Sequence, residues 1–337
     1  MAMSGKKILR GGVVGCGMIS EFHLRGWQRI PEVEIVALAD PSAAAAEDRR
    51  GKYAPQAQLY PDISAMLAQE RLDFVDIITP PWLHAEHCLA AKAANVHVIC
   101  QKPLCLELDA AARLVDAMSG SSKIFAVHEN HRFRPWFLEV RRRHAEGFFG
   151  KLRYARIDQF DPYEPAEKFK ADAARGVVLE YGTHLIDMAR ALLGEPHQVF
   201  ARAHKPNPRV RGESLAHVVF DHPEATSVIE VGWKAAGLQQ GGFLLVGDKG
   251  EAVLEGRLTR DLASRFRLVS GNEVVLDQAR SPTEDYVDSF YLMERDVTDA
   301  MLEGRAPEQT GVENLRTLEA TFACYQAMEE GRLVRIP

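Results

Sequence analysis

The chain has 337 residues, a length that suggests about two domains, each long enough to bury a substantial core. It contains 41 Lys and Arg against 47 Asp and Glu, so its formal net charge is −6. This mild acidic excess argues against nucleic acid as the main partner, because phosphate backbones are bound by basic surfaces. The sequence has no uninterrupted apolar stretch of the roughly 18 residues that a membrane span needs, so we expect no membrane partner.

The cysteines favour a cytoplasmic location. Five are present, an odd number, and they are scattered without the spacing of a metal site. Reduced thiols in a cytoplasmic protein fit this pattern best, and we expect no metal ion.

Residues 7–40 have the pattern of a βαβ unit that binds a dinucleotide. An apolar strand leads into a glycine turn, a helix follows, and a second apolar strand ends in an acid. Gly15 allows the tight turn, Gly17 lets the backbone approach a pyrophosphate, and Asp40 can accept hydrogen bonds from a ribose. The alternative is a purely structural turn, which the complete context disfavours. We predict NAD as the cofactor, because Asp40 would repel the 2′-phosphate of NADP and no cation follows it closely.

Further strands alternate with helices up to residue 129. The expected strands cover residues 72–78, 97–100 and 123–127. This alternation predicts a parallel, doubly wound sheet and therefore an α/β dinucleotide-binding domain over residues 1–129. After Asp40 the next cationic side chains are those of Arg49 and Arg50, which lie on the helix that follows, too far along the chain to be expected beside Asp40.

From residue 130 the pattern changes to short strands joined by turns, which favours antiparallel pairing. The expected strands cover residues 152–160, 198–203, 215–220, 226–231, 242–246, 251–254, 265–269 and 273–276. We predict an α+β domain over 130–337 with a large, mostly antiparallel, open-faced sheet. A helix at about 312–330 should pack back onto the body. The open face must be solvated or covered by another subunit, and we expect a homo-oligomer.

In a doubly wound sheet the ligand lies beyond the carboxyl ends of the strands. The segments there include residues 79–84 and 101–103. Lys102 stands out because a strand precedes it and a proline fixes the turn behind it. Taken alone, Lys102 is better explained as a solvated loop lysine than as a functional one.

A second group of polar residues covers positions 180–187. Glu180 and His184 are four residues apart and Asp187 is three further on, so they can share one edge of a helix that begins near residue 183. A carboxylate, an imidazole and a second carboxylate together suit acid–base chemistry. A satisfied core histidine is the alternative, and these residues alone leave the choice open.

Together these segments resemble the Gfo/Idh/MocA family of sugar and cyclitol oxidoreductases over essentially the whole chain. The matching segments are the glycine turn at 15–20, Thr79-Pro80 with His84, Lys102-Pro103, residues 182–187 and the tail 311–334. The resemblance implies a Rossmann domain followed by an open-faced sheet domain that commonly mediates dimers or tetramers. It also implies that Lys102 and His184 correspond to the lysine of the family's EKP motif and the histidine of its DxxxH motif.

The chain departs from the family pattern at two positions. Gln101 replaces the glutamate before the lysine, and Glu180 replaces the aspartate four residues before the histidine. Gln101 keeps a hydrogen-bonding carbonyl but lacks the charge. Some relatives with a Gln-Lys-Pro form look like sugar dehydrogenases, so this change does not argue for inactivity. Glu180 leaves the identity of the substrate open.

We therefore predict an NAD-dependent oxidoreductase that transfers hydride between nicotinamide and a hydroxyl carbon of a sugar, polyol or cyclitol, with a D-apiose-like pentose as a specific candidate. The predicted catalytic residues are Lys102, His184 and Glu180. The predicted cofactor-binding residues are Gly15, Gly17, Met18, Ile19, Asp40, Thr79, Pro80, His84, Gln101 and Lys102. The predicted substrate-binding residues are Lys102, Tyr163, Glu180, His184 and Asp187. Two alternatives stay open: an NAD-binding regulator without turnover, and an enzyme with tightly bound NAD that acts by transient oxidation.

Overall fold

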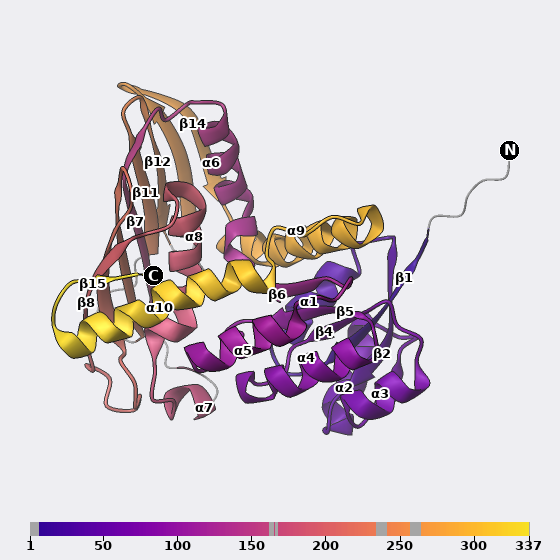
Figure 1. Ribbon diagram of the computed structural model, residues 1–337. Coiled ribbons are helices and arrows are strands. Elements are labelled where there is room, and N and C mark those ends of the chain that lie inside the picture. The colour runs from indigo at the N-terminus through magenta and orange to yellow at the C-terminus, as the bar shows by residue number, and fades with distance from the viewer. Residues whose placement is uncertain (1–6, 162–164, 166–167, 234–240, 257–263, 337) are drawn as a thin grey trace, which may run out of the picture. The chain divides into compact units, whose positions relative to one another are not determined.

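A computed structural model of the chain divides into two compact units (Figure 1). The first contains Met1–Asn130 and Val287–Leu315, and the second contains His131–Tyr286 and Arg316–Pro337. The sequence predicts a single domain boundary between residues 129 and 130. In the structure, residues 287–315 also belong to the first unit. The structure describes residues 7–161, 165, 168–233, 241–256 and 264–336. None of the helices in these ranges is both long enough and apolar enough to cross a membrane.

The first unit is built on six parallel strands in the order β3-β2-β1-β4-β5-β6. The strands are β1 (Leu9–Val14), β2 (Val33–Ala39), β3 (Gln58–Tyr60), β4 (Phe74–Ile77), β5 (His97–Gln101) and β6 (Phe125–His128). The chain winds outward in one direction from β1 to β3 and in the other from β4 to β6. The order therefore reverses between β1 and β4, which is where doubly wound sheets bind ligands. This confirms the predicted doubly wound fold, to which the short strand β3 is an unpredicted addition.

Helices of the first unit connect these strands. They are α1 (Ser20–Trp27), α2 (Ala43–Tyr53), α3 (Ile63–Gln69), the 3₁₀ turn η1 (Pro81–Leu83), α4 (His84–Ala93) and α5 (Leu108–Met118). The side chains of Ser42 and Asp62 accept hydrogen bonds from the backbone N–H groups of Ala45 and Ala65, which caps the N-termini of α2 and α3. Helix α9 (Pro282–Glu303) returns to this unit from Val287 onward.

The second unit is built on a nine-stranded sheet in the order β14-β13-β12-β11-β7-β10-β9-β8-β15. Its strands are β7 (Leu152–Asp161), β8 (Gln198–His204), β9 (Leu215–Asp221), β10 (Thr226–Trp233), β11 (Gly241–Gly247), β12 (Gly250–Gly256), β13 (Ser264–Ser270), β14 (Glu273–Arg280) and β15 (Val334–Arg335). Only β7 and β10 pair in parallel among these strands, so the predicted large, mostly antiparallel sheet is confirmed.

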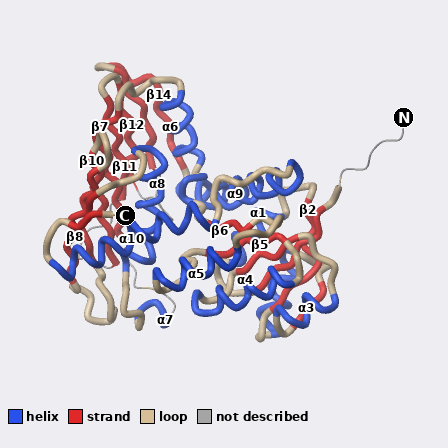
Figure 2. The backbone as a smooth tube through the Cα atoms, in the orientation of Figure 1, coloured by secondary structure: helices blue, strands red, loops and turns tan. Residues whose placement is uncertain are grey.

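One face of this sheet is covered by helices, as Figure 2 shows in blue beside the red strands. The helices of this unit are the 3₁₀ turn η2 (His131–Phe133), α6 (Pro135–Ala145), α7 (Lys168–Ala171), the π-helix η3 (Val178–Gly182), α8 (Thr183–Leu193) and most of α10 (Gly311–Glu330). Trp136 from α6, Leu185 from α8 and Cys324 from α10 join one apolar core with the inward side chains of the strands. Large apolar side chains also point outward from the other face: Phe200 is 36% exposed and Val219 is 38% exposed.

Candidate active site

The glycine turn after β1 has the conformation that the sequence predicts. Gly15 has a φ of +97°, and a Cβ added to it would lie 2.8 Å from the carbonyl carbon and oxygen of Ile78, so glycine is required here. A Cβ at Gly17 would meet no atom within 4 Å, which leaves open space over the turn. Ser20 is fully buried and its Oγ donates to the carbonyl of Gly17 over 2.6 Å. The turn can therefore let a pyrophosphate approach its backbone, with Met18 exposed beside it.

Asp40 follows β2 and reaches back to this turn. Its Oδ2 accepts from the backbone N–H of Cys16 over 2.7 Å, and its Oδ1 accepts from that of Ser42 over 2.8 Å. Burial, with the nearby Asp40 charge, raises the pKa of Cys16 to about 12, so this thiol is neutral at physiological pH. The carboxylate thus lies at the predicted ribose-binding position, held from both sides.

Arg49 lies at the same turn, although in the sequence it comes nine residues after Asp40. Its Nε donates to Ser20 Oγ over 3.0 Å and its Nη2 donates to the carbonyl of Gly17 over 3.2 Å. Its remaining nitrogen pairs with Asp48 at 2.7 Å. The feature of the sequence that could have indicated this contact is the position of Arg49, about two helical turns after the start of α2. Because α2 packs against α1, a residue there can return to the glycine turn.

His84 joins the loops that follow β4 and β5. Its ring is fully buried, with Nε2 2.8 Å from the carbonyl oxygen of Thr79 and Nδ1 3.0 Å from that of Pro103. Burial lowers the pKa of His84 to about 4, so the ring is neutral and donates one proton at a time. His84 therefore lies between the carbonyls of Thr79 and Pro103 and donates its single N–H to one of them. Thr79 also uses its hydroxyl, which lies 3.1 Å from His87 Nδ1.

Lys102 follows directly after β5, as predicted. The amide oxygen Oε1 of Gln101 accepts from the backbone N–H of Lys102 over 2.7 Å, and the peptide bond between Lys102 and Pro103 is cis. The side chains of Gln101 and Lys102 are both partly exposed. The end of β5 is thus held by a local hydrogen bond, with a cationic residue at the ligand-binding edge of the sheet.

In the second unit Glu180 and His184 lie on consecutive helical elements. Glu180 belongs to η3, and His184 is the second residue of α8, which begins at Thr183 as the sequence predicts. Lys170 on α7 pairs with Glu180 at 2.8 Å. The ring of His184 is buried and stacks on that of His131, with ring centroids 3.8 Å apart.

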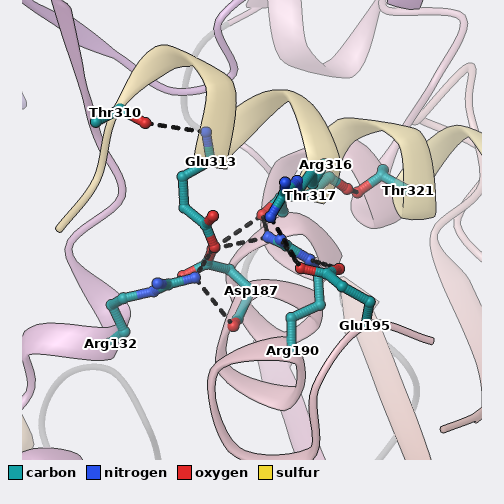
Figure 3. Close-up of polar contacts among 9 residues, drawn as sticks. All are labelled: Arg132, Asp187, Arg190, Glu195, Thr310, Glu313, Arg316, Thr317 and Thr321. Carbon is teal, nitrogen blue, oxygen red and sulfur yellow. Dashed lines mark hydrogen bonds and ion pairs between the residues drawn. The ribbon is translucent and has the colours of Figure 1, made fainter. Parts of the chain in front are cut away.

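Asp187 lies one turn after His184 at the centre of a buried ion-pair network (Figure 3). Arg132 donates to both of its oxygens, over 2.6 Å from Nε and 2.5 Å from Nη2, and Thr317 Oγ1 donates to Oδ1 over 2.9 Å. Arg190 donates to the same threonine and pairs with Glu195 through two nitrogens. Asp187 is fully buried. Its carboxylate therefore fastens α8 to α10 and η2, a role that the sequence did not suggest.

The remaining predicted residues have less specific surroundings. Ile19 directly precedes α1 and Pro80 directly precedes η1. Tyr163 lies outside the described residues.

Comparison with known proteins places this geometry in a family. Residues 9–129 match the model "Oxidoreductase family, NAD-binding Rossmann fold", and residues 137–253 match "GFO/IDH/MocA C-terminal domain". A D-apiose dehydrogenase of Paraburkholderia graminis is 31% identical over 98% of this chain and 90% of its own length. The chain belongs to the Gfo/Idh/MocA family.

Two further relatives extend this comparison. A D-apiose dehydrogenase of Rhizobium rhizogenes is 26% identical, covering 97% of each chain. The structure of an Agrobacterium radiobacter oxidoreductase in complex with NAD⁺, L-tartaric acid and magnesium matches with a TM-score of 0.85 at 24% identity, over 97% of this chain and 98% of its own, which shows the shared fold. The protein is thus an oxidoreductase with an NAD-binding Rossmann domain, as the sequence predicted.

Proposed function

We propose that this oxidoreductase uses NAD to oxidise a CH–OH group of a sugar, polyol or cyclitol, and that a D-apiose-like pentose is the specific candidate substrate. The observation that carries the proposal is the 31% identity with a D-apiose dehydrogenase over 98% of the chain. Lys102 at the end of β5 and His184 at the start of α8 support it, because both are proton-carrying groups at the predicted positions.

In this proposal the two residues act on the hydroxyl whose carbon is oxidised. Bound NAD would supply the hydride acceptor. Gly15, Gly17 and Asp40 would hold the dinucleotide, while Lys102 and His184 would orient the hydroxyl and take its proton. Stacking on His131 restricts the orientation of the His184 ring, which suits a group that must meet a hydroxyl in one geometry.

Glu180 would orient the substrate as well. Its carboxylate pairs with Lys170, and both side chains are partly buried, with 17% exposure for Glu180 and 20% for Lys170. Carboxylates that accept hydrogen bonds are suited to sugar hydroxyl groups. We also propose that residues 130–337 carry substrate binding and oligomerisation, with Asp187 acting through the position of α8.

We further propose a homodimer or homotetramer formed through the open face of the nine-stranded sheet. Across β7, β10, β9 and β8 the strand register aligns a charged row, Asp158, Glu230, His217 and Arg202. The neighbouring outward row continues from Arg156 through Val228 and Val219 to Phe200. This face carries apolar side chains together with charges of both signs. It can therefore pair with the same face of a second copy.

A cytoplasmic location completes the proposal. All five cysteines are free and buried, which fits a reducing compartment.

The direct test is a substrate screen. Purified protein is incubated with NAD and D-apiose, other pentoses and hexoses, polyols and inositols, and both NADH and oxidised product are measured. We expect NADH to accumulate in equal amount with product for at least one pentose. Conversion of the substrate to a product of unchanged overall oxidation state, without NADH, would favour transient oxidation by tightly bound NAD. NAD binding without turnover on any compound would favour a regulator and contradict the proposal.

A further inference from the structure

A chain of hydrogen bonds within the first unit connects the backbone of Lys102, through Gln101, to the buried side chains of His23 and Asp76. The backbone N–H of Lys102 donates to Gln101 Oε1 over 2.7 Å, and Gln101 Nε2 lies 2.8 Å from His23 Nε2. On the other side of the ring, His23 Nδ1 lies 2.9 Å from Asp76 Oδ2. His23 on α1 and Asp76 on β4 are fully buried. These hydrogen bonds therefore tie the residue after β5 to two other elements of the unit.

The chemistry of the groups fixes where each proton lies. A backbone N–H can only donate, so the atom of Gln101 that faces Lys102 is the carbonyl oxygen. The atom that faces His23 is then the amide nitrogen, which donates to an unprotonated Nε2. The ring proton must be on Nδ1, from which it is donated to Asp76. His23 is thus a neutral imidazole with a single permitted tautomer.

The groups around His23 agree with this assignment. Trp27 Nε1 donates to the same oxygen of Asp76 over 2.8 Å. Glu294 Oε1 lies 3.8 Å from His23 Nδ1, and burial, together with the Asp76 charge, raises the pKa of Glu294 well above its usual value. The ring of His128 lies 4.0 Å from that of His23, and burial lowers the pKa of His128 well below its usual value. Both shifts favour the uncharged forms of Glu294 and His128.

A metal ion is the competing explanation for this cluster, because ligand atoms of His23, His128 and Glu294 lie within 4.8 Å of one another. The hydrogen bonds weigh against it. His23 would have to give Nδ1 to the metal and carry its proton on Nε2. That proton would then point at the amide N–H of Gln101, whose oxygen is already engaged by Lys102. The arrangement therefore favours a hydrogen-bonded His23 over a His23 that binds a metal ion.

We propose that Gln101 and His23 are positioning residues that fix the main chain of Lys102 through uncharged hydrogen bonds. The proposal rests on the proposed function, because it assigns Lys102 to catalysis. An amide is needed at position 101 since it alone can accept from Lys102 and donate to a neutral His23. A carboxylate of the same size keeps the first bond and loses the second, unless an additional proton binds to the carboxylate or to the ring.

Enzyme kinetics test the positioning role with Gln101→Leu and Gln101→Glu. Gln101→Leu should lower kcat by about 10-fold with little change in KM, because geometry at the reacting atoms is lost while substrate binding is kept. Gln101→Glu should keep near-normal kcat at low pH and lose it as pH rises, because the additional proton that completes the bond dissociates. Gln28→Leu and Gln28→Glu are matched controls, since the side-chain amide of Gln28 donates to the carbonyl of Tyr53 and Gln28 is exposed. Wild-type kcat in Gln101→Leu, or coincident pH profiles for Gln101→Glu and wild type, would overturn the proposal.

Two NMR measurements decide the arrangement even without a known substrate. In protein with ¹⁵N-labelled histidine, we expect His23 to show a protonated Nδ1 and an unprotonated Nε2, with its signals identified by their loss in His23→Gln. The amide of Lys102 should exchange at least about 10-fold faster in Gln101→Leu than in wild type, because its hydrogen bond is removed. Protonation of His23 at Nε2, or unchanged exchange at Lys102, would refute the proposal. A failure of wild-type protein to oxidise any sugar or polyol would count against the proposed function alone.

Discussion

The imidazole rings of His131 and His184 are stacked, with centroids 3.8 Å apart and planes inclined by 18°. Arg134 donates to Nε2 of His131 over 3.2 Å, so the supporting ring carries its proton on Nδ1 and is neutral. The ring of His184 thus packs against the neutral ring of His131. Its position in the second residue of α8 and its buried ring make it the best acid–base candidate in the second unit.

Lys102→Ala and His184→Ala should each lower turnover by at least about 10²-fold if the two residues act on the same hydroxyl proton. The double variant should then fall much less than multiplicatively. NAD affinity should change little in His184→Ala and somewhat more in Lys102→Ala. Steady-state kinetics with thermal melts separates this from a surface lysine and a core histidine, which predict an active Lys102→Ala and an unstable His184→Ala. Wild-type turnover in Lys102→Ala would end the catalytic assignment.

Cofactor choice should depend on two opposing charges at the glycine turn. We expect NAD to bind more tightly than NADP, because Asp40 repels a 2′-phosphate. Asp40→Ser should raise the affinity for NADP relative to NAD by at least about 10-fold, since Arg49 then remains as a cation beside the turn. The double variant Asp40→Ser/Arg49→Gln should lose most of that gain. Competitive binding of both cofactors measures this, and tighter NADP binding by wild type would contradict the assignment.

Asp187→Asn should reduce stability, because it leaves the buried Arg132 without its charged partner. Breaking such a pair costs about 3 kcal/mol or more of unfolding free energy. Asp248→Asn is the matched control: Asp248 pairs with Arg153 through two hydrogen bonds, but both side chains are nearly half exposed. The control should shift the melting temperature much less. Chemical denaturation measures both, and equal losses would show that burial does not matter here.

Oligomers formed through the open sheet face should be sensitive to charge in its apolar row. Val219→Lys should shift the protein toward monomer in light scattering at micromolar concentration, while the melt stays cooperative, because an unpaired ammonium would be buried between copies. Val312→Lys places the same charge at a 55% exposed site outside the sheet and should leave the oligomer intact. A wild-type protein that is monomeric would refute this interface.

Stability should fall in acid partly through His84. Its pKa is about 4 in the folded protein against 6.5 for an ordinary histidine, so the unfolded chain binds the proton first. The stabilisation is complete above pH 6.5 and is lost as pH falls toward 4, by on the order of 3 kcal/mol. Denaturant titrations across this range should give a shallower pH dependence for His84→Gln than for wild type. Parallel curves would exclude a contribution from His84.

Local patterns in the sequence predicted much of the fold and the elements on which several candidate residues lie. The conformation of the glycine turn, the position of Asp40 and the start of α8 at Thr183 are determined by residues close in sequence. They can therefore be predicted from local patterns. Strand β3 has only three residues at the edge of its sheet, too few to show a period. The contacts of His23 with Asp76 and Gln101 join residues 53 and 78 positions apart, and no local pattern encodes them.

The parallel pairing of β7 with β10 has a consequence for how this scaffold can be diversified. Parallel neighbours need a long connection, and here the chain between Asp161 and Thr226 contains η3 and α8 along with two strands. Glu180 and His184 therefore lie on a connecting segment rather than on the strands it joins. A mutant library confined to residues 170–174 and 180, where no side chain is fully buried, should yield new substrate preferences while the pairing of β7 with β10, and with it expression and folding yield, is retained.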